Sequence, residues 1–418
     1  MNNLIIPNII SQHAEEASFL WLLRNNAVHE PHYSLKDLAK LDNRVEAHID
    51  GLRVAGDDGW NICKEALAWK EEGELFTAAV LAFESGNDDR IQEVLKAGTA
   101  EPGLSRGIIS ALGWLDYSIS QNHIQTLLDS ESPDLRLIGI AASAVHRKDP
   151  GKYLSDAIAD GDPRLKDRAL RAAGELGRKD LLPFISTLIN DKDDNCRFWA
   201  SWSAAVLGDV SAVSALKDQI SSKLPQKQAE DAVKLALRQM DISSALSWQK
   251  ELSQNPRTLR LSLTGAGVMG DPALIPFMIE YMKAPEQARV AGEAFTMITG
   301  ADLAFLDLEG EKPEGFEPGP TENPEDEDVA MDPDEDLPWP NHELVLGWWN
   351  RNRNQFNNGN RYLTGKQITA EHLQQVLRSG RQRQRAAAAL ELVIMRPGQP
   401  LFEVRAQGIR QQKILGLK

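Results

Sequence analysis

Histidines are the residues of this 418-residue chain best suited to catalysis or to metal binding. Two of the eight lie close together, at His29 and His32, with Glu30 and Pro31 between them. A zinc helix of the H-E-x-x-H kind places its two histidines one turn apart on one face, and a proline between them prevents that arrangement. The other six histidines are scattered, and no cysteine stands at ligand spacing from them. The pattern predicts a surface loop, with no metal site and no cofactor.

A glycine-rich run at Gly265, Gly267 and Gly270 matches the G-x-G-x-x-G pattern of dinucleotide-binding loops. No strand is predicted before it, and its glycines coincide with positions of an internal repeat. The serine-nucleophile pattern G-x-S-x-G is absent. The two cysteines, Cys63 and Cys196, cannot build a disulfide framework, which favours a reducing cytoplasm. We therefore expect no catalytic residues, and a protein that is not an enzyme.

Two other groups of residues are candidates for binding a partner. The basic run Arg381, Arg383 and Arg385 carries charges that could contact a partner or neutralise phosphates. A solvated helix start, or pairing with the acidic block of the chain itself, explains the same run. Most of the ten tryptophans are expected in the core, but Trp199 and Trp202 are candidates for a binding face, since tryptophan is enriched at interface hot spots.

Charge divides the chain into three blocks. Residues 301–340 hold 15 acidic residues and one basic residue, Lys312, whereas residues 341–418 hold 13 basic and 4 acidic residues. The acidic block is rich in proline and glycine and poor in apolar residues, which is typical of an unpacked linker. Residues 1–300 are net acidic, so nucleic-acid binding is not expected. No apolar run approaches the ~18–20 residues of a membrane helix, and the first seven residues lack the features of a signal peptide.

An internal repeat of ~31 residues organises the middle of the chain. It is marked by prolines at intervals of 29 to 31 residues, or twice that: Pro102, Pro133, Pro163, Pro225, Pro256 and Pro285. Eleven residues after each start the residue is small in all but the last unit: Ala82, Gly113, Ala144, Gly174, Ala205, Ala236 and Gly267. Glycines such as Gly177 and Gly270 then favour a helix end. Each unit is predicted to form two short helices that cannot bury their apolar faces without neighbours.

The expected fold is therefore an all-α, HEAT-like α-solenoid of about eight two-helix repeats with helical caps. We expect an N-terminal helical cap at 1–70, the repeat array at 71–300, the acidic linker at 301–340 and a basic helical region at 341–418. The cap is predicted to hold separate helices at 14–23, 35–41, 44–52 and 60–69. The last region is either a small domain or a pair of layers folded back on the array.

The repeats resemble short bacterial HEAT-like repeats, which are also found in phycobilin-lyase-type proteins. A wider resemblance rests on four segments: ASFLWLLRNNAV, HYSLKDLAKLDNRVEAHIDGLRVAG, RYLTGKQIT and RQRQRAAAALELVIMRPGQPLFEVRA. With the repeats between them, these are similar to a family of uncharacterised bacterial proteins often encoded beside type VI secretion spike genes. The resemblance implies a cytoplasmic accessory protein that acts on spike or effector loading.

The leading functional hypothesis is a non-enzymatic scaffold, adaptor or chaperone that grips a protein partner on the concave face of the array. The alternative is a lyase-like HEAT-repeat enzyme or cofactor-handling protein, which would need a pocket of convergent titratable groups. A third reading is self-association, with the acidic linker of one chain on the basic C-terminus of another. The sequence leaves the partner and the oligomeric state open.

Overall fold

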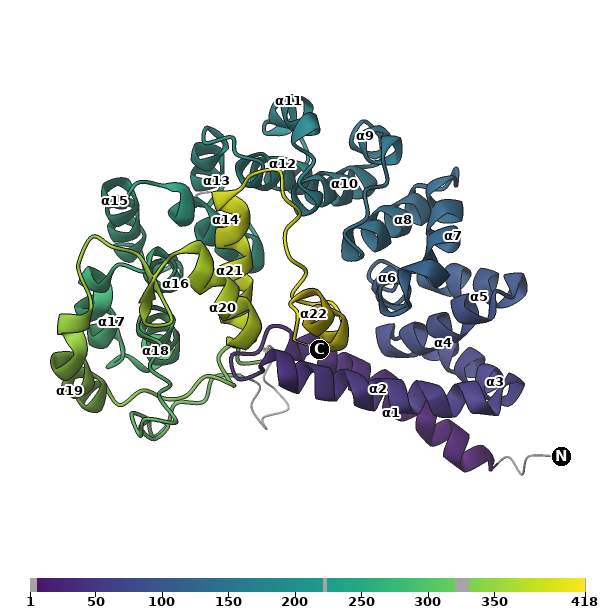
Figure 1. Ribbon diagram of the computed structural model, residues 1–418, viewed down its shortest axis with the longest axis horizontal. Helices are drawn as coiled ribbons and strands as arrows, with labels where there is room; N and C mark the ends of the chain where they lie inside the picture. Colours follow the sequence, from purple (N-terminus) through teal and green to yellow (C-terminus); the bar gives the residue numbers. More distant parts are fainter. Residues whose placement is uncertain (1–5, 221–223, 320–330, 418) are drawn as a thin grey trace. The chain divides into compact units, whose positions relative to one another are not determined.

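The computed structural model describes residues 6–220, 224–319 and 331–417 (Figure 1). Contacts divide the chain into two compact units. Unit 1 comprises 1–209, 378–383 and 393–418, and unit 2 comprises 210–377 and 384–392. The regular secondary structure of the described residues is helical except for one two-stranded sheet, and these residues form an all-α solenoid. Among these residues no helix combines the length and the apolarity that crossing a membrane requires.

Unit 1 begins with three helices and continues with the helix pairs of the repeats. Its helices are α1 (Pro7–Ala27), α2 (Leu35–Ala55), α3 (Asp57–Ala66), α4 (Glu72–Ser85), α5 (Asp88–Gly98), α6 (Ser105–Trp114), α7 (Tyr117–Leu128), α8 (Pro133–Val145), α9 (Lys152–Ile158), α10 (Pro163–Leu176), α11 (Leu182–Ile185), α12 (Asp194–Val206) and α22 (Gly408–Ile414). Short 3-10 turns are η1 (Leu67–Trp69), η2 (Lys179–Leu181) and η3 (Ser186–Leu188). The first helices pack in chain order, α4 on α6, α6 on α8, α8 on α10 and α10 on α12.

Unit 2 continues the same pattern. Its elements are α13 (Ala212–Ile220), α14 (Gln226–Gln239), α15 (Ile242–Ser253), α16 (Leu259–Met269), η4 (Pro272–Leu274), α17 (Ile275–Tyr281), α18 (Pro285–Thr299), α19 (His342–Asn352), η5 (Arg353–Gln355), β1 (Tyr362–Leu363) and β2 (Lys366–Gln367). Helix α14 packs on α16, and α16 packs on α18. Two further helices, α20 (Ala370–Ser379) and α21 (Gln382–Met395), contribute residues to both units.

The small residues of the repeat allow the first helices to approach closely. A methyl group added at Gly174 in α10 would lie 2.6 Å from the hydroxyl oxygen of Ser203 in α12. One added at Gly267 in α16 would lie 2.8 Å from the Cα of Ala294 in α18. Glycine at φ 73° ends α16 at position 270, in the left-handed conformation that L side chains rarely adopt. The repeat register read from the sequence is thus confirmed at the level of packing.

The N-terminal cap differs from the sequence-based expectation at one point. The sequence predicted two helices at 35–41 and 44–52, whereas α2 runs unbroken from Leu35 to Ala55. The polar pair Asp42 and Asn43 suggested a break, but Asp42 is buried and its carboxylate binds Arg24 of α1. A polar residue with a partner across the helix interface does not need to interrupt the helix.

The basic C-terminal residues pack on the ends of the repeat helices. In unit 2 the backbone N–H of Tyr362 donates to the carbonyl of Gly270 at 2.9 Å, and that of Thr364 donates to Met297 at 2.7 Å. In unit 1 the N–H of Leu401 donates to the carbonyl of Glu175 at 2.9 Å. The last carbonyls of a helix have no partner within the helix. These segments supply the missing donors.

Part of the acidic block packs on helices α16 and α18 within unit 2, to which the block belongs. The carboxylate of Asp334 accepts two hydrogen bonds from Arg260, both at 2.6 Å, and Asp332 lies 2.6 Å from Arg289. Leu337 of the same segment is also buried. The expectation of an unpacked linker therefore fails for residues 331–340, because arginines on α16 and α18 neutralise its carboxylates. Residues 320–330 of the predicted linker lie outside the described residues.

Candidate functional site

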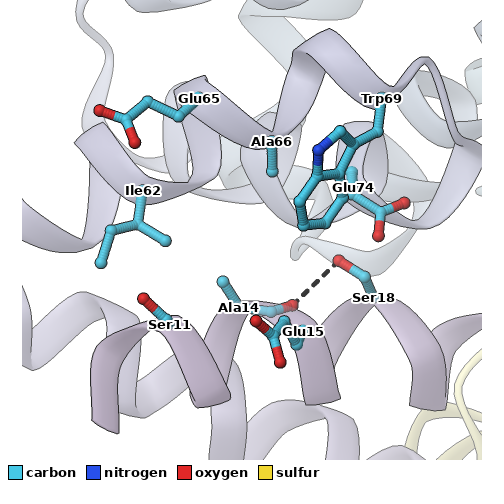
Figure 2. A pocket seen from close by; sticks show the side chains of 9 residues that line it. All are labelled: Ser11, Ala14, Glu15, Ser18, Ile62, Glu65, Ala66, Trp69 and Glu74. Carbon is cyan, nitrogen blue, oxygen red and sulfur yellow. Dashed lines mark hydrogen bonds between the residues drawn. The ribbon is translucent and has the colours of Figure 1, made fainter. Parts of the chain in front are cut away.

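A pocket of about 310 Å³ lies between α1 and the end of α3 (Figure 2). Four of its lining residues share one face of α1, because they follow one another at helical spacing: Ser11, Ala14, Glu15 and Ser18. The opposite wall belongs to α3, η1 and the first turn of α4: Ile62, Glu65, Ala66, Trp69 and Glu74. The pocket is built within unit 1 by the N-terminal cap and the first repeat.

Three glutamates give the pocket its charge. Glu15 and Glu65 are exposed, whereas Glu74 is half-buried. One carboxylate oxygen of Glu74, Oε2, is buried and has no hydrogen-bond partner among the described residues. Burial raises the pKa of Glu74, and the neighbouring carboxylate of Glu71 raises it further. The lining thus contributes three carboxyl groups and, among the described residues, no cation that would neutralise them.

The lysines nearest in sequence are engaged elsewhere. The ammonium of Lys64 lies 2.6 Å from Glu93, and that of Lys70 lies 2.5 Å from Glu101. Within the described part of the chain, no lysine or arginine lines the pocket. The polar groups that remain are the hydroxyls of Ser11 and Ser18, and Ser18 donates to the carbonyl of Ala14 at 3.0 Å. A positively charged ligand would meet carboxylates without a competing cation.

An aromatic ring and an apolar stripe adjoin the carboxylates. Trp69 is 59% exposed. Figure 2 shows its indole next to Glu74, on the side of the pocket that faces α1. On α1 the exposed apolar side chains of Phe19 and Leu22 follow Glu15 at intervals of four and seven residues, and Leu23 lies beside them. Large apolar side chains grouped at the surface often mark an interaction site.

The spread of the carboxylates determines what the pocket can bind. Among the described residues, the carboxylate oxygens of Glu15, Glu65 and Glu74 do not gather within 4.8 Å of one another, as a shared metal ion would require. Figure 2 shows Glu15 on the α1 side of the pocket, and Glu65 and Glu74 at separate places on the opposite side. The lining residues include no histidine or cysteine. The arrangement suits a long side chain that carries its charge at the tip, such as lysine or arginine.

The three arginines of the basic run differ in how far they are exposed to solvent. Arg381 is partly exposed and donates to the carbonyl of His32 at 2.8 Å. Arg383 is half-buried and donates to the carbonyl of His29 at 2.6 Å. Arg385 is fully buried and donates to the carbonyl of Leu377 at 2.7 Å, so its guanidinium is not at the surface where a binding role was expected.

The two candidate tryptophans lie one turn apart on α12. Trp202 is buried against α10, where its ring would meet a methyl group at Gly174. Trp199 is half-buried, and the guanidinium of Arg171 lies over its ring, 4.6 Å from the centroid. The sequence placed Trp199 on a helix face but gave no sign of Arg171, which is 28 residues away. It also gave no sign of the pocket, because its residues lie outside the clear repeat register.

Comparison with known proteins agrees with the observed fold. Residues 152–237, from α9 into α14, match the family model described as HEAT repeats. The match supports a HEAT-like repeat protein, and repeats of this class commonly serve as protein-interaction scaffolds without enzymatic activity. No curated protein matches the chain.

Proposed function

We propose that this protein is a non-enzymatic scaffold or adaptor, and that the pocket between α1 and α3 receives a lysine or arginine side chain of its protein partner. The observation that carries the proposal is the set of three glutamates around one pocket without a neutralising cation. Carboxylates form the strongest hydrogen bonds of a protein with charged donors. A basic side chain in the pocket would supply those donors.

Trp69 adds a second reason to expect a basic side chain. The face of an indole attracts an ammonium or guanidinium group, and the attraction is worth ~0.5–1 kcal/mol at an exposed site. The aliphatic stem of the same side chain can pack on Ile62 and Ala66, which line the pocket. The pocket therefore fits both the charge and the shape of lysine or arginine.

The apolar stripe Phe19, Leu22 and Leu23 would contact the residues beside that basic side chain. Binding energy at protein interfaces concentrates in a few aromatic, apolar or arginine anchors surrounded by weaker contacts. A partner helix with one basic residue and apolar residues at helical spacing fits this surface. Trp199 and Arg381 remain candidates for contacts elsewhere on the protein.

The sequence resemblance favours a partner of one kind. It points to spike or effector proteins of a type VI secretion system, which this protein would hold as an accessory or loading factor in the bacterial cytoplasm. The fold supports a binding role in general, and the pocket supports a basic partner surface. The type VI partner rests on the resemblance alone.

Affinity capture with matched variants tests the proposal. The tagged full-length protein, the variant Glu15→Gln/Glu65→Gln and the control Glu131→Gln/Asp156→Asn are each used to capture proteins from the native cytoplasm. All four substituted carboxylates are exposed residues of unit 1, so the two variants change the net charge equally. We expect a partner that the pocket variant loses and the control retains. Equal capture by both variants contradicts the pocket, and the absence of spike or effector proteins contradicts the type VI assignment.

A further inference from the structure

Two histidines on neighbouring helices of unit 1 face each other. His13 belongs to α1 and His48 to α2, and the two helices pack on each other (Figure 1). The Nδ1 atoms of the two imidazoles are 3.2 Å apart, and the rings meet at their edges with their planes at 62°. Both side chains are half-buried. The pair therefore brings two ring nitrogens together at one point of the contact between α1 and α2.

The backbone of α2 leaves room for the ring of His13. A methyl group added at Gly51 would lie 2.7 Å from both Nε2 and Cδ2 of His13, which is closer than a Cβ atom can approach. The imidazole thus rests on α2 in the space that the Cβ of any other residue would fill. Glycine inside a helix is unfavourable relative to alanine, and at this position it allows the ring to reach His48.

The separation of the two nitrogens suits a shared metal ion. Zn²⁺ binds imidazole nitrogens at ~2.0–2.1 Å in tetrahedral geometry, which places two such ligands ~3.3–3.4 Å apart. The observed 3.2 Å is close to that value. A hydrogen bond accounts for the same distance, and it needs a proton on only one of the two Nδ1 atoms. When that proton moves to Nε2 of the same ring, each Nδ1 presents a lone pair to an ion.

The surroundings of His48 favour the neutral imidazole, which is the form that binds metals. Burial lowers the pKa of His48, and the charge of His13 lowers it further. Two other charged groups act on His48: Glu16 of α1 opposes this shift, and Arg44 of α2 adds to it. The carboxylate of Glu16 therefore also supplies negative charge near the pair, which favours a cation there.

We propose that His13 and His48 bind a divalent transition-metal ion such as Zn²⁺ through their two Nδ1 atoms, with water in the remaining positions. Imidazole is a common ligand of Zn²⁺, Cu²⁺ and Ni²⁺, whereas Mg²⁺ and Ca²⁺ take oxygen ligands. Among the described residues no third histidine, cysteine or carboxylate gathers with the pair within 4.8 Å, so the protein supplies two ligands. A bound ion would link α1 to α2.

This site goes beyond the proposed function, because it lies on another side of α1 from the pocket. His13 is two residues away from both Ser11 and Glu15, which line the pocket. Two residues turn an α-helix through ~200°, so His13 and these pocket residues point in opposite directions. The 35 residues between His13 and His48 explain why spacing along the sequence gave no sign of the pair.

Calorimetric titration of the untagged full-length protein with Zn²⁺ tests the site, in excess Mg²⁺ that occupies sites made of carboxylates alone. We expect the wild type to bind Zn²⁺, and His13→Gln and His48→Gln each to bind it at least ~10-fold more weakly, since even residues that only support a ligand contribute about 10–100-fold. The control His32→Gln removes an exposed histidine of unit 1 and should bind as the wild type does. Gly51→Ala keeps both ligands but displaces the ring of His13, so it should also weaken binding.

Thermal melting of each variant shows that the comparison is made between folded proteins, and His48→Gln carries the comparison if His13→Gln does not fold. Zn²⁺ should also raise the melting temperature of the wild type and of His32→Gln, but not that of the two pair variants. Three results would overturn the proposal: no Zn²⁺ binding by the wild type, equal affinities of the wild type and the pair variants, or a loss in His32→Gln alone. None of the substituted residues lines the α1–α3 pocket, so the two proposals fail separately.

Discussion

Arg24 and Asp42 form a buried ion pair between α1 and α2, with Arg24 Nε 2.8 Å from the carboxylate of Asp42. Both side chains also bind the C-terminal segment. Arg24 Nη2 donates to the carbonyl of Arg405 at 2.6 Å, and the N–H of Gly408 donates to Asp42 at 2.5 Å. The pair thereby joins the N-terminal cap to residues more than 360 positions away in the chain.

Removing one partner of this pair should destabilise the protein strongly. In the variant Arg24→Met, the carboxylate of Asp42 stays buried without its counter-ion, which costs ~3–5 kcal/mol in comparable cases. We expect a loss of that size in the free energy of unfolding, measured by urea denaturation. The double variant Arg24→Met/Asp42→Asn should recover part of the loss. If Arg24→Met is as stable as the wild type, the ion pair contributes little to the free energy of unfolding.

The close approach of α10 and α12 makes Gly174 sensitive to substitution. A methyl group there would lie 2.6 Å from Ser203 Oγ and 2.9 Å from the ring of Trp202. We expect Gly174→Ala to lower the free energy of unfolding by ~1–3 kcal/mol, as for other overpacked cores. Gly161→Ala is the control, since a methyl group at Gly161 meets nothing within 4 Å. Thermal melting that ranks the two variants equally would argue against the tight helix contact.

Acid should destabilise the protein through His146. Burial, assisted by the charges of Arg410 and Lys148, lowers the pKa of His146 from 6.5 to about 4. The unfolded chain then binds a proton that the folded protein does not, so stability falls as the pH drops from about 6.5 to about 4, by up to ~3 kcal/mol. Asp167 acts in the opposite direction, because its raised pKa favours the folded state as the pH falls below about 6. The contribution of His146 is therefore read from the difference in pH-dependent unfolding free energy between the wild type and a variant that lacks this histidine.

The variant His146→Gln isolates that contribution. Its amide can still donate to the carbonyl of Leu112, which His146 contacts at 2.8 Å through Nε2, but it does not titrate. Urea denaturation at pH 7.5, 6 and 5 should show a smaller loss of stability in the variant than in the wild type. Identical pH profiles would mean that His146 is not the group responsible.

The packing of residues 331–340 depends on Asp334. Its side chain is nearly fully buried and binds Arg260 through both oxygens. We expect Asp334→Asn to weaken these contacts and to raise amide hydrogen exchange in residues 331–340, because an amide lacks the charge that the guanidinium of Arg260 attracts. Asp307→Asn, at an exposed position of the same acidic block, should leave the exchange unchanged. Unchanged exchange in Asp334→Asn would indicate that Leu337 and its neighbours hold the segment without the ion pairs.

The sequence predicted those features of the fold that depend on the pattern of residues within a single repeat. Pro133, Pro163 and Pro285 each occupy the first position of a helix, as the repeat register required. The small residues at Gly174 and Gly267 lie where neighbouring helices meet. The helix starts and the close helix contacts can be predicted because every repeat needs the same residue types at the same positions within a short segment.

What the sequence did not predict depends on pairs far apart in the chain. Asp334 binds Arg260, which lies 74 residues earlier in the chain. The composition of the acidic block alone had indicated an unpacked linker. Trp69 was counted among tryptophans mostly expected in the core, yet it is 59% exposed beside the pocket. The carboxylates around it come from three separate helical segments whose packing no repeat pattern specifies. The division into four segments and the role of Arg381 stay predictions.

The most direct test of the account is the affinity of the α1–α3 pocket for a basic side chain. A labelled peptide with one lysine between leucines is titrated by fluorescence anisotropy with wild type, Glu15→Gln/Glu65→Gln and the control Glu131→Gln/Asp156→Asn. The account predicts a ~10-fold weaker affinity for the pocket variant and little change for the control. Equal affinities for all three proteins would contradict the assignment of this pocket as the site that receives a basic partner residue.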